Sequence, residues 1–199
     1  MRRAIRIVPI LVLSPATFAD VVVFENDYNG FLEAVGVVNV IDFDTLPNGE
    51  PTEVSVELTE DFNYDEQGVH FSAPIPYPFC AGNPSSGFGL RVEGGTEESW
   101  IITELITPAQ AVGGFFGGFT ELCTFDELGD QIACVSYSEP GGPNFVGIVS
   151  DIPIHSATLG DGDESETISS FVFAPVPEPG TVILVASGLV FMARRRRRS

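Results

Sequence analysis

Carboxylates are the most abundant side chains in this sequence that could do chemistry. The run Asp161-Gly162-Asp163-Glu164-Ser165-Glu166 carries four of them in six residues, and Asp42 and Asp44 form a second, smaller group. Hard cations such as calcium prefer oxygen ligands of this kind, although neither group has the spacing of an EF-hand. The sequence therefore offers two candidate calcium sites, Asp161 with Asp163 and Asp42 with Asp44. The alternative for the first is a solvated acidic loop, and no other cofactor is expected.

The residue types that usually act in catalysis form no recognised catalytic motif in this sequence. The two histidines, His70 and His155, have neither a GxSxG elbow nor the spacing of zinc ligands around them. We interpret both as ordinary strand residues. Glycoside hydrolysis needs only two carboxylates at a set separation, and the sequence nominates no pair. We expect a protein that is not an enzyme, and the alternative is a secreted polysaccharide hydrolase that uses two carboxylates.

Charge divides the chain into an acidic body and two basic ends. There is no lysine, and eight of the nine arginines lie in the terminal segments, so that Arg91 is the only basic residue between them. Twenty-seven carboxylates fall between Asp20 and Val176. Nucleic-acid binding depends on lysine and arginine contacts to phosphate, which this body cannot supply. The composition excludes a nucleic-acid partner.

The N-terminal segment, residues 1–19, has the features of a secretory signal peptide. Three arginines precede an apolar run from Ile7 to Leu13, and Thr17-Phe18-Ala19 supplies small residues at the first and third positions. We predict cleavage between Ala19 and Asp20. A retained anchor is the alternative, but seven apolar residues cover only about 10 Å of a bilayer core of about 30 Å.

The C-terminal segment, residues 176–199, has three parts in a fixed order. Val176-Pro177-Glu178-Pro179 comes first, the apolar run from Val182 to Ala193 follows, and Arg194 to Arg198 close the segment. Each proline disfavours helix on its N-terminal side, so a helix begins only after Pro179. We predict a short transmembrane helix of about 20 Å, whose arginines stay cytoplasmic.

This terminal segment resembles the PEP-CTERM family of sorting signals, found in Gram-negative bacteria that produce exopolysaccharide. The resemblance covers about the last 24 residues. It implies export through the inner membrane and transient anchoring there by the C-terminal helix. The partner that it implies is exosortase, a membrane-embedded transpeptidase that would cut at or near Val176 to Pro179. The mature protein would then reach the cell surface or the extracellular space. A plain tail anchor is the alternative.

Three cysteines, Cys80, Cys123 and Cys134, would meet an oxidising compartment after export, where pairing is expected. Leu122 to Tyr137 has the pattern of a hairpin centred on Leu128-Gly129. Counting outward from that turn places Cys123 opposite Cys134, within reach of a cross-strand disulfide. We favour this pair, and the alternative pairs Cys80 with one of the other two.

The body, residues 20–175, has the pattern of a single all-β domain without a convincing helix. Apolar and polar residues alternate over short runs bounded by glycine, proline and asparagine. These runs predict a jelly-roll antiparallel β-sandwich, with Ile41 and Phe43 in the core and Asp42 and Asp44 facing out. The predicted strands are residues 21–25, 37–43, 53–58, 68–72, 87–92, 100–105, 111–116, 122–125, 131–137, 145–149, 157–159 and 168–173.

The body also resembles the jelly-roll domains, loosely similar to carbohydrate-binding modules, that precede PEP-CTERM signals. The similar segments include "IDFDTLPNG", "AVGGFFGGF" and "GDQIACVSYS". Tyr77, Trp100 and the segment 74–79 could form an aromatic platform for sugar rings, or else an edge loop packed on the core. The sequence therefore predicts a surface or matrix protein that binds or scaffolds extracellular polysaccharide.

Overall fold

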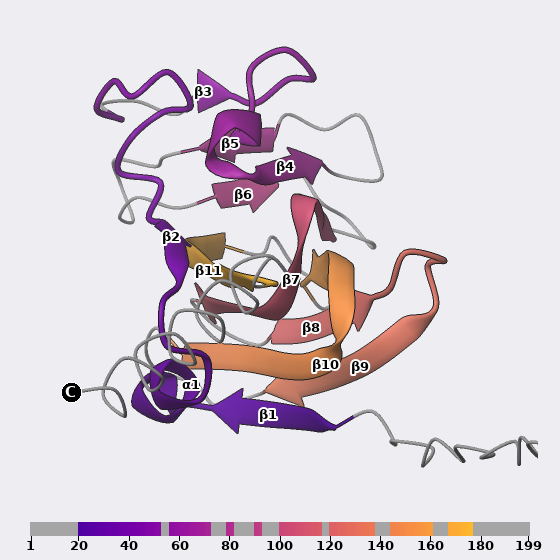
Figure 1. Ribbon diagram of the computed structural model, residues 1–199. Helices are drawn as coiled ribbons and strands as arrows, with labels where there is room; N and C mark the ends of the chain where they lie inside the picture. Colours follow the sequence, from indigo (N-terminus) through magenta and orange to yellow (C-terminus); the bar gives the residue numbers. More distant parts are fainter. Residues whose placement is uncertain are drawn as a thin grey trace, which may run out of the picture.

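The fold is an antiparallel β structure with one α-helix (Figure 1). The computed structural model describes residues 20–52, 56–72, 79–81, 90–92, 100–116, 120–137, 144–160 and 167–176. Its elements in chain order are β1 (Val21–Glu25), α1 (Tyr28–Val35), β2 (Asn39–Ile41), β3 (Val56–Glu57), the 3-10 helix η1 (Asp65–Gln67), β4 (Val69–Ser72), β5 (Phe79–Ala81), β6 (Leu90–Val92), β7 (Ile101–Phe116), β8 (Thr120–Phe125), β9 (Gln131–Tyr137), β10 (Asn144–Leu159) and β11 (Thr167–Pro175).

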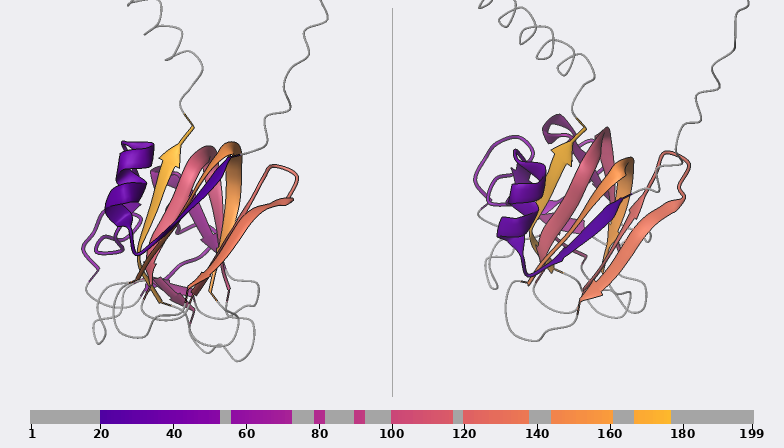
Figure 2. Two further views of the ribbon diagram at one scale, coloured as in Figure 1. Left: turned by 90° about the horizontal axis from the view of Figure 1, so that it is seen from below. Right: turned by 60° about the horizontal axis from the view of Figure 1, so that its bottom comes forward.

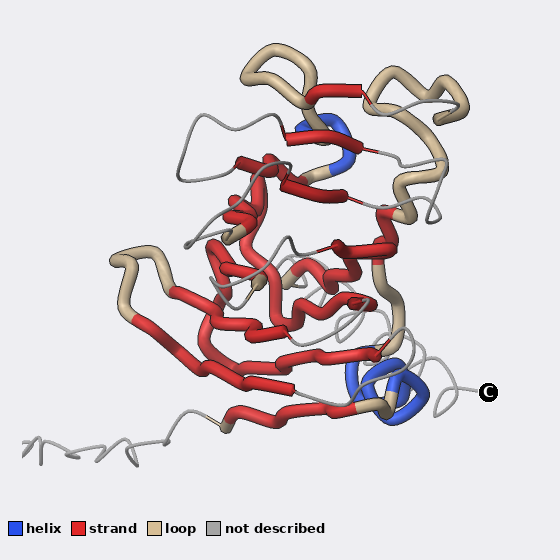
Figure 3. The backbone as a smooth tube through the Cα atoms, turned by 180° about the vertical axis from the view of Figure 1, so that it is seen from behind, coloured by secondary structure: helices blue, strands red, loops and turns tan. Residues whose placement is uncertain are grey.

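Two long strands, β7 and β10, are shared by both layers of the sandwich. Their halves nearest to residues 116 and 144 lie in a sheet with the order β2-β11-β7-β10-β1, which we call the covered sheet. Their other halves lie in a sheet with the order β4-β7-β10-β8-β9, which we call the open sheet. Figure 1 shows β10 running along the first sheet and curving into the second. The layers are thus joined through continuous strands, as the tube in Figure 3 also shows.

Both long strands bend at a proline. The pairing of β10 with β7 shifts register between Val149 and Ile154, next to Pro153, and Pro108 lies at the matching point of β7. Proline lacks the N–H group that a ladder needs and therefore occurs at bulges and edges. The polar groups of the bulge are satisfied locally, since Ile152 N–H donates to Ser150 Oγ at 3.0 Å. The two strands therefore bend at the prolines, where the ladder lacks an N–H donor.

The main core fills the space between the two sheets. It takes alternate residues from each inner face, including Phe71, Ile101 and Leu122 from the open sheet and Phe116 and Phe171 from the covered sheet, all at most 2% exposed. Phe43, Tyr64 and Phe71 pack edge to face there. Burial of these rings removes a large apolar area from water, which is the main driving force for closing the two layers.

The helix α1 corrects the expectation of a body without helices. Tyr28, Phe31, Leu32 and Val35 recur at helical spacing, the Asp27 side chain accepts Gly30 N–H at 2.8 Å, and Gly36 ends the helix at a φ of +79°. The stripe packs on the outer face of the covered sheet and forms a second cluster with Phe145 and Val172. Figure 2 shows α1 on that side of the strands.

Glycine provides the space in which α1 docks. A Cβ atom at Gly147 would lie 2.7 Å from Phe31 Cδ2 and 2.9 Å from Phe145 Cζ. Gly113 is its partner on β7, where a Cβ atom would meet the Val146 carbonyl oxygen at 2.8 Å. Side chains are excluded at Gly147 by the two aromatic rings and at Gly113 by the backbone carbonyl group.

The all-β prediction is confirmed, with several corrections to its strands. The strands predicted at residues 100–105 and 111–116 are joined in one strand, β7, which begins at Ile101, and residues 145–149 and 157–159 form parts of β10. The strand β5 was not predicted. The inward positions of Ile41 and Phe43 and the exposure of Asp42 and Asp44 are confirmed. The jelly-roll connectivity stays a prediction.

No helix among the described residues is long and apolar enough to span a membrane. The predicted transmembrane helix, residues 181–193, lies outside them, as does the predicted signal peptide of residues 1–19.

Candidate functional site

The sorting motif follows the last strand without a spacer. β11 ends at Pro175, and Val176 N–H still donates to the Pro108 carbonyl oxygen on β7 at 3.0 Å. Val176 is 38% exposed. Pro177, Glu178 and Pro179 lie outside the described residues. The predicted cleavage region therefore begins at a residue that is still hydrogen-bonded to the folded body.

The predicted N-terminus of the mature chain lies at the bulge of β10. Asp20 N–H donates to Asp151 Oδ1 at 3.0 Å, and Asp151 N–H donates back to the Asp20 carbonyl oxygen at 3.3 Å. Ala19 lies outside the described residues. These reciprocal bonds fasten the start of β1 to the bend of β10, and sequence reasoning missed Asp151 because no local pattern pairs it with Asp20.

The open sheet presents an outer face that α1 does not cover, and the short 3-10 helix η1 reaches it at His70. Buried residues such as Ile101, Thr103 and Leu105 point inward, so alternation places Ile102 and Glu104 on the outside. The register continues this face across neighbouring strands in two rows. One row contains His70, Glu104, Ser156 and Phe125, and the other contains Ser72, Ile102, Thr158, Cys123 and Cys134.

Trp100 extends this outer face at one end. It precedes the inward-facing Ile101 and is half-buried, so alternation places its ring on the same side as Ile102. The β7–β10 pairing ends at Ile101 with Leu159, and the residue that follows β10, Gly160, has no side chain. Gly160 N–H donates to the Glu121 carbonyl oxygen at 3.0 Å. The other parts of the predicted aromatic platform, Tyr77 and residues 74–78, lie outside the described residues.

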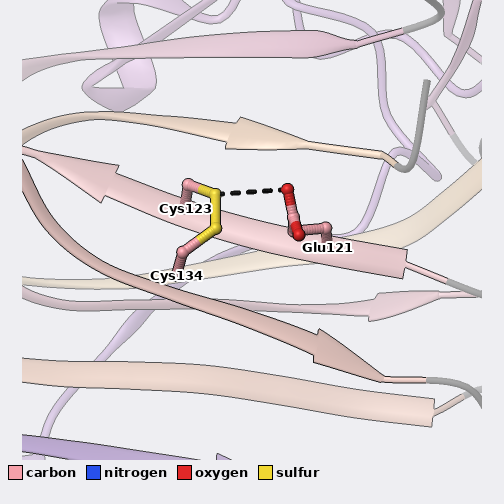
Figure 4. A group of neighbouring side chains, drawn as sticks. All are labelled: Glu121, Cys123 and Cys134. Atoms are coloured by element: carbon pink, nitrogen blue, oxygen red, sulfur yellow. Dashed lines mark hydrogen bonds between the residues drawn. A yellow bond between two sulfur atoms is a disulfide. The ribbon is translucent and has the colours of Figure 1, made fainter.

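Cys123 and Cys134 are direct cross-strand partners on β8 and β9 and are joined by a disulfide, with Cα atoms 4.0 Å apart (Figure 4). Asp126 stabilises the connecting turn, because its carboxylate accepts Leu128 N–H and Asp130 N–H at 2.9 Å each. Glu121 lies two residues before Cys123, on the same face of β8, and its carboxylate accepts Ser136 Oγ–H at 2.7 Å. The hairpin is thereby closed by one covalent and one polar cross-strand link.

The same hairpin holds the one group of at least three potential metal-ligating side chains among the described residues. Glu121, Cys123 and Cys134 have ligand atoms within 4.8 Å of one another. The contact of 3.5 Å between Cys123 Sγ and Glu121 Oε1 is the dashed line of Figure 4. A disulfide sulfur carries no proton and is no thiolate ligand, so this contact is neither a thiol hydrogen bond nor a metal site.

The two candidate calcium sites differ in what is known of them. Asp161 and Asp163 lie outside the described residues. Asp42 and Asp44 are exposed, and Asp42 Oδ1 accepts Asp44 N–H at 3.1 Å. Burial raises the pKa of Tyr64 well above its usual range, and the nearby Asp42 carboxylate raises it further. Tyr64 donates its hydroxyl proton to the Thr45 carbonyl oxygen at 2.9 Å.

The histidines occupy different surroundings. His70 Nδ1 lies 2.9 Å from Asp65 Oδ1, and its residue pairs with Glu104 on β7. His155 is half-buried in the irregular part of β10. Sequence reasoning missed the functional potential of Glu104, Ser156 and Thr158. The alternation around residue 104 was visible, but the pairing of β7 with β10 across more than 50 residues was not.

Comparison with known proteins identifies a family motif in the C-terminal segment. The family described as PEP-CTERM protein-sorting motif matches residues 175–198. The chain thus carries a PEP-CTERM sorting motif, which implies export, membrane-associated sorting in a Gram-negative bacterium and processing by exosortase. No curated protein matches the chain.

Two solved structures show limited similarity to the body. One is a histidine mutant of the lectin binding domain of lectinolysin complexed with Lewis b, at 8% identity and a TM-score of 0.38, over 54% of this chain and 92% of that one. The other is the enzymatically active domain of bacteriophage CBA120 tailspike protein 4, at 13% identity and a TM-score of 0.23, over 70% of this chain and 17% of that one.

Proposed function

We propose that this protein is a surface or matrix protein that binds extracellular polysaccharide without catalysis, after exosortase has processed its C-terminus. The observation that supports the binding role is the outer face of the open sheet. Strand pairing brings aromatic, hydroxyl and carboxylate side chains together there, and α1 does not cover them.

The chemistry of that face matches a sugar chain. Trp100 and Phe125 are half-buried aromatic residues, and the apolar faces of sugar rings stack on such rings. Glu104, Ser156 and Thr158 supply hydrogen-bonding groups between them, and a carboxylate forms the stronger kind of hydrogen bond with a sugar hydroxyl. β7, which Trp100 precedes, and β8, which carries Glu121, are two strand spacings apart, about 10 Å.

Charge narrows the class of polysaccharide. The body carries 27 carboxylates and one arginine, and Glu104 and Glu121 belong to the face itself. Like charges across an interface are strongly unfavourable, so chains rich in uronic acids or sulfate are rejected. Neutral polysaccharides and those with free amino sugars fit.

Binding of the processed protein to an array of neutral, amino-sugar and acidic glycans, with and without calcium, tests this proposal. We expect Trp100→Ala and Glu104→Gln each to weaken binding about tenfold, because the first removes an aromatic ring on which sugars stack and the second removes a charged hydrogen-bond acceptor. Leu128→Ala is the matched control, since Leu128 is an 84% exposed apolar residue at the tip of the β8–β9 turn. Wild-type binding to no glycan would leave only a scaffold role.

The same samples test the enzymatic alternative. A hydrolase needs two carboxyl groups about 5 to 9 Å apart, flanking the scissile bond. Release of reducing ends from a bound polysaccharide, lost in Glu104→Gln, would contradict the assignment as a non-enzyme. We expect binding without any release of reducing ends.

A further inference from the structure

The end of β11 places the folded body close to the membrane before processing. Val176 is still hydrogen-bonded to Pro108, and the apolar run of the sorting signal begins at Val182. The five residues 177–181 span at most about 18 Å even when fully extended. An enzyme that cuts between Val176 and Pro179 therefore reaches a bond that is next to the bends of β7 and β10.

The start of β1 lies at the same end of the covered sheet. Val21 pairs with Ser150, Val149 pairs with Ala111, and Ala111 pairs with Ala174. Asp20 and Val176 are therefore at one level, on the outer strands of the four-strand order β1-β10-β7-β11. Figure 2 shows the beginning of β1 and the tip of β11 at one end of the sandwich. We call this end, formed by Asp20, Ile106, Pro108, Asp151 and Val176, the terminal corner.

The terminal corner combines apolar and acidic groups. Ile106 is 57% exposed and lies two residues before Pro108 in the chain. Val176 is 38% exposed, and its N–H group donates to the Pro108 carbonyl oxygen. Asp20 and Asp151 add two exposed carboxylates. An anionic phospholipid surface repels such carboxylates. A protein surface with apolar and basic or hydrogen-donating groups is the better match.

We propose that the terminal corner is a docking surface for exosortase, so that the enzyme recognises the folded body together with the Pro-Glu-Pro motif. This inference rests on the proposed processing by exosortase. Because the cleavage region adjoins the terminal corner, an enzyme that binds this region also contacts the corner. The exposed Ile106 and the two carboxylates give the enzyme specific groups to bind.

Spacer insertion into the full-length chain in its native host tests the proposal. Two and four Gly-Ser residues are inserted between Val176 and Pro177, which leaves the motif and the apolar run intact. The rate of loss of the arginine tail is followed by pulse-chase labelling and mass spectrometry. We expect the rate to fall about tenfold, the effect of losing one good interfacial contact. The same insertions between Leu128 and Gly129, in the β8–β9 turn, which holds no residue of the terminal corner, are the control and should leave the rate unchanged.

Ile106→Asp provides a second variant, because it alters the corner while the spacing to the motif stays native. We expect a similar loss, with an unchanged melting temperature because Ile106 is largely exposed. An unchanged or faster rate in the spacer variants and in Ile106→Asp would overturn the docking surface, since the corner would then be neutral or an obstacle. Replacement of Pro177-Glu178-Pro179 by alanines separates the two claims. Normal processing of that variant would refute exosortase recognition itself, whereas its loss together with unaffected corner variants would refute only the docking.

Discussion

The backbone nitrogen of Asp20 lies 3.0 Å from Asp151 Oδ1, at the bulge where β10 turns from one sheet into the other. Cleavage between Ala19 and Asp20, which the sequence predicts, would turn this amide into a free α-ammonium group. The hydrogen bond would then become an ion pair at the first residue of the mature chain. Export would thus strengthen the link between β1 and β10, for which the precursor supplies only an uncharged donor.

Asp151→Asn tests this maturation-dependent ion pair. Because the pair is exposed, we expect the melting temperature of the mature protein to fall by only about 1–2 °C near pH 6.5. The ammonium is charged below the range where a free α-amino group titrates, about pH 7.7–8.0, and its contribution is lost as the pH rises above that range. The difference from wild type should therefore vanish near pH 10. Glu127→Gln, which removes another exposed carboxylate, should show no such pH dependence. A constant difference at every pH would contradict the ion pair.

Tyr64 should limit stability in alkaline solution. Its pKa is raised in the folded state by burial and then by Asp42, whereas the unfolded residue titrates near pH 10. Its contribution is complete below about pH 10 and is lost as the pH rises further, because unfolding then releases the proton. We expect urea unfolding between pH 9.5 and 11 to show a steeper loss of stability in wild type than in Tyr64→Phe. Tyr28→Phe serves as the control, and equal slopes in all three proteins would refute the role of Tyr64.

Gly147→Ala should disturb the docking of α1. The added methyl group meets the Phe31 ring at 2.7 Å and the Phe145 ring at 2.9 Å, and neither ring has free space to move. Overpacking of this kind costs about 1–3 kcal/mol, which chemical denaturation measures. Phe31→Leu in the same chain should recover part of the loss, so a double-mutant cycle should show coupling. Simple additivity of the two changes would contradict a direct clash.

We propose that the acidic run of residues 161–166 binds calcium, and substitutions at the two candidate sites test this proposal. One millimolar calcium should raise the melting temperature of wild type by about 3–5 °C if it saturates a site about tenfold. Asp161→Asn with Asp163→Asn should abolish this shift. Asp42→Asn with Asp44→Asn should preserve it, because Asp42 Oδ1 already accepts a backbone N–H group. An equal shift with magnesium, or with matched ionic strength, would show screening in place of a site.

Local signals in the sequence predicted the elements that depend on neighbouring residues. β1 and β9 have the predicted bounds, because alternation and flanking turn residues define each strand on its own. The turn at residues 126–130 fixes the register of the hairpin that brings Cys123 to Cys134. The helix α1 was missed although its cap and apolar stripe are local, since its eight residues include Gly30 and are shorter than most helices.

Long-range pairing explains what the sequence could not predict. Separate strands were predicted on either side of Pro108 and of Pro153, but β7 and β10 continue past these prolines because both fall where the ladder shifts register. The rows on the open sheet and the terminal corner depend on pairings between residues far apart in the sequence, such as Glu104 with Ser156. No local pattern specifies such partners. The sorting motif could be predicted because its three parts follow one another in the sequence and depend on no long-range pairing.

The most direct test of the account is the mass of the mature C-terminus, measured on the protein isolated from the cell surface or the medium. The account predicts that the wild-type chain ends within Val176 to Pro179 and that alanines at Pro177-Glu178-Pro179 leave the full tail in place. A wild-type surface protein that retains Arg194 to Arg198 would contradict processing by exosortase.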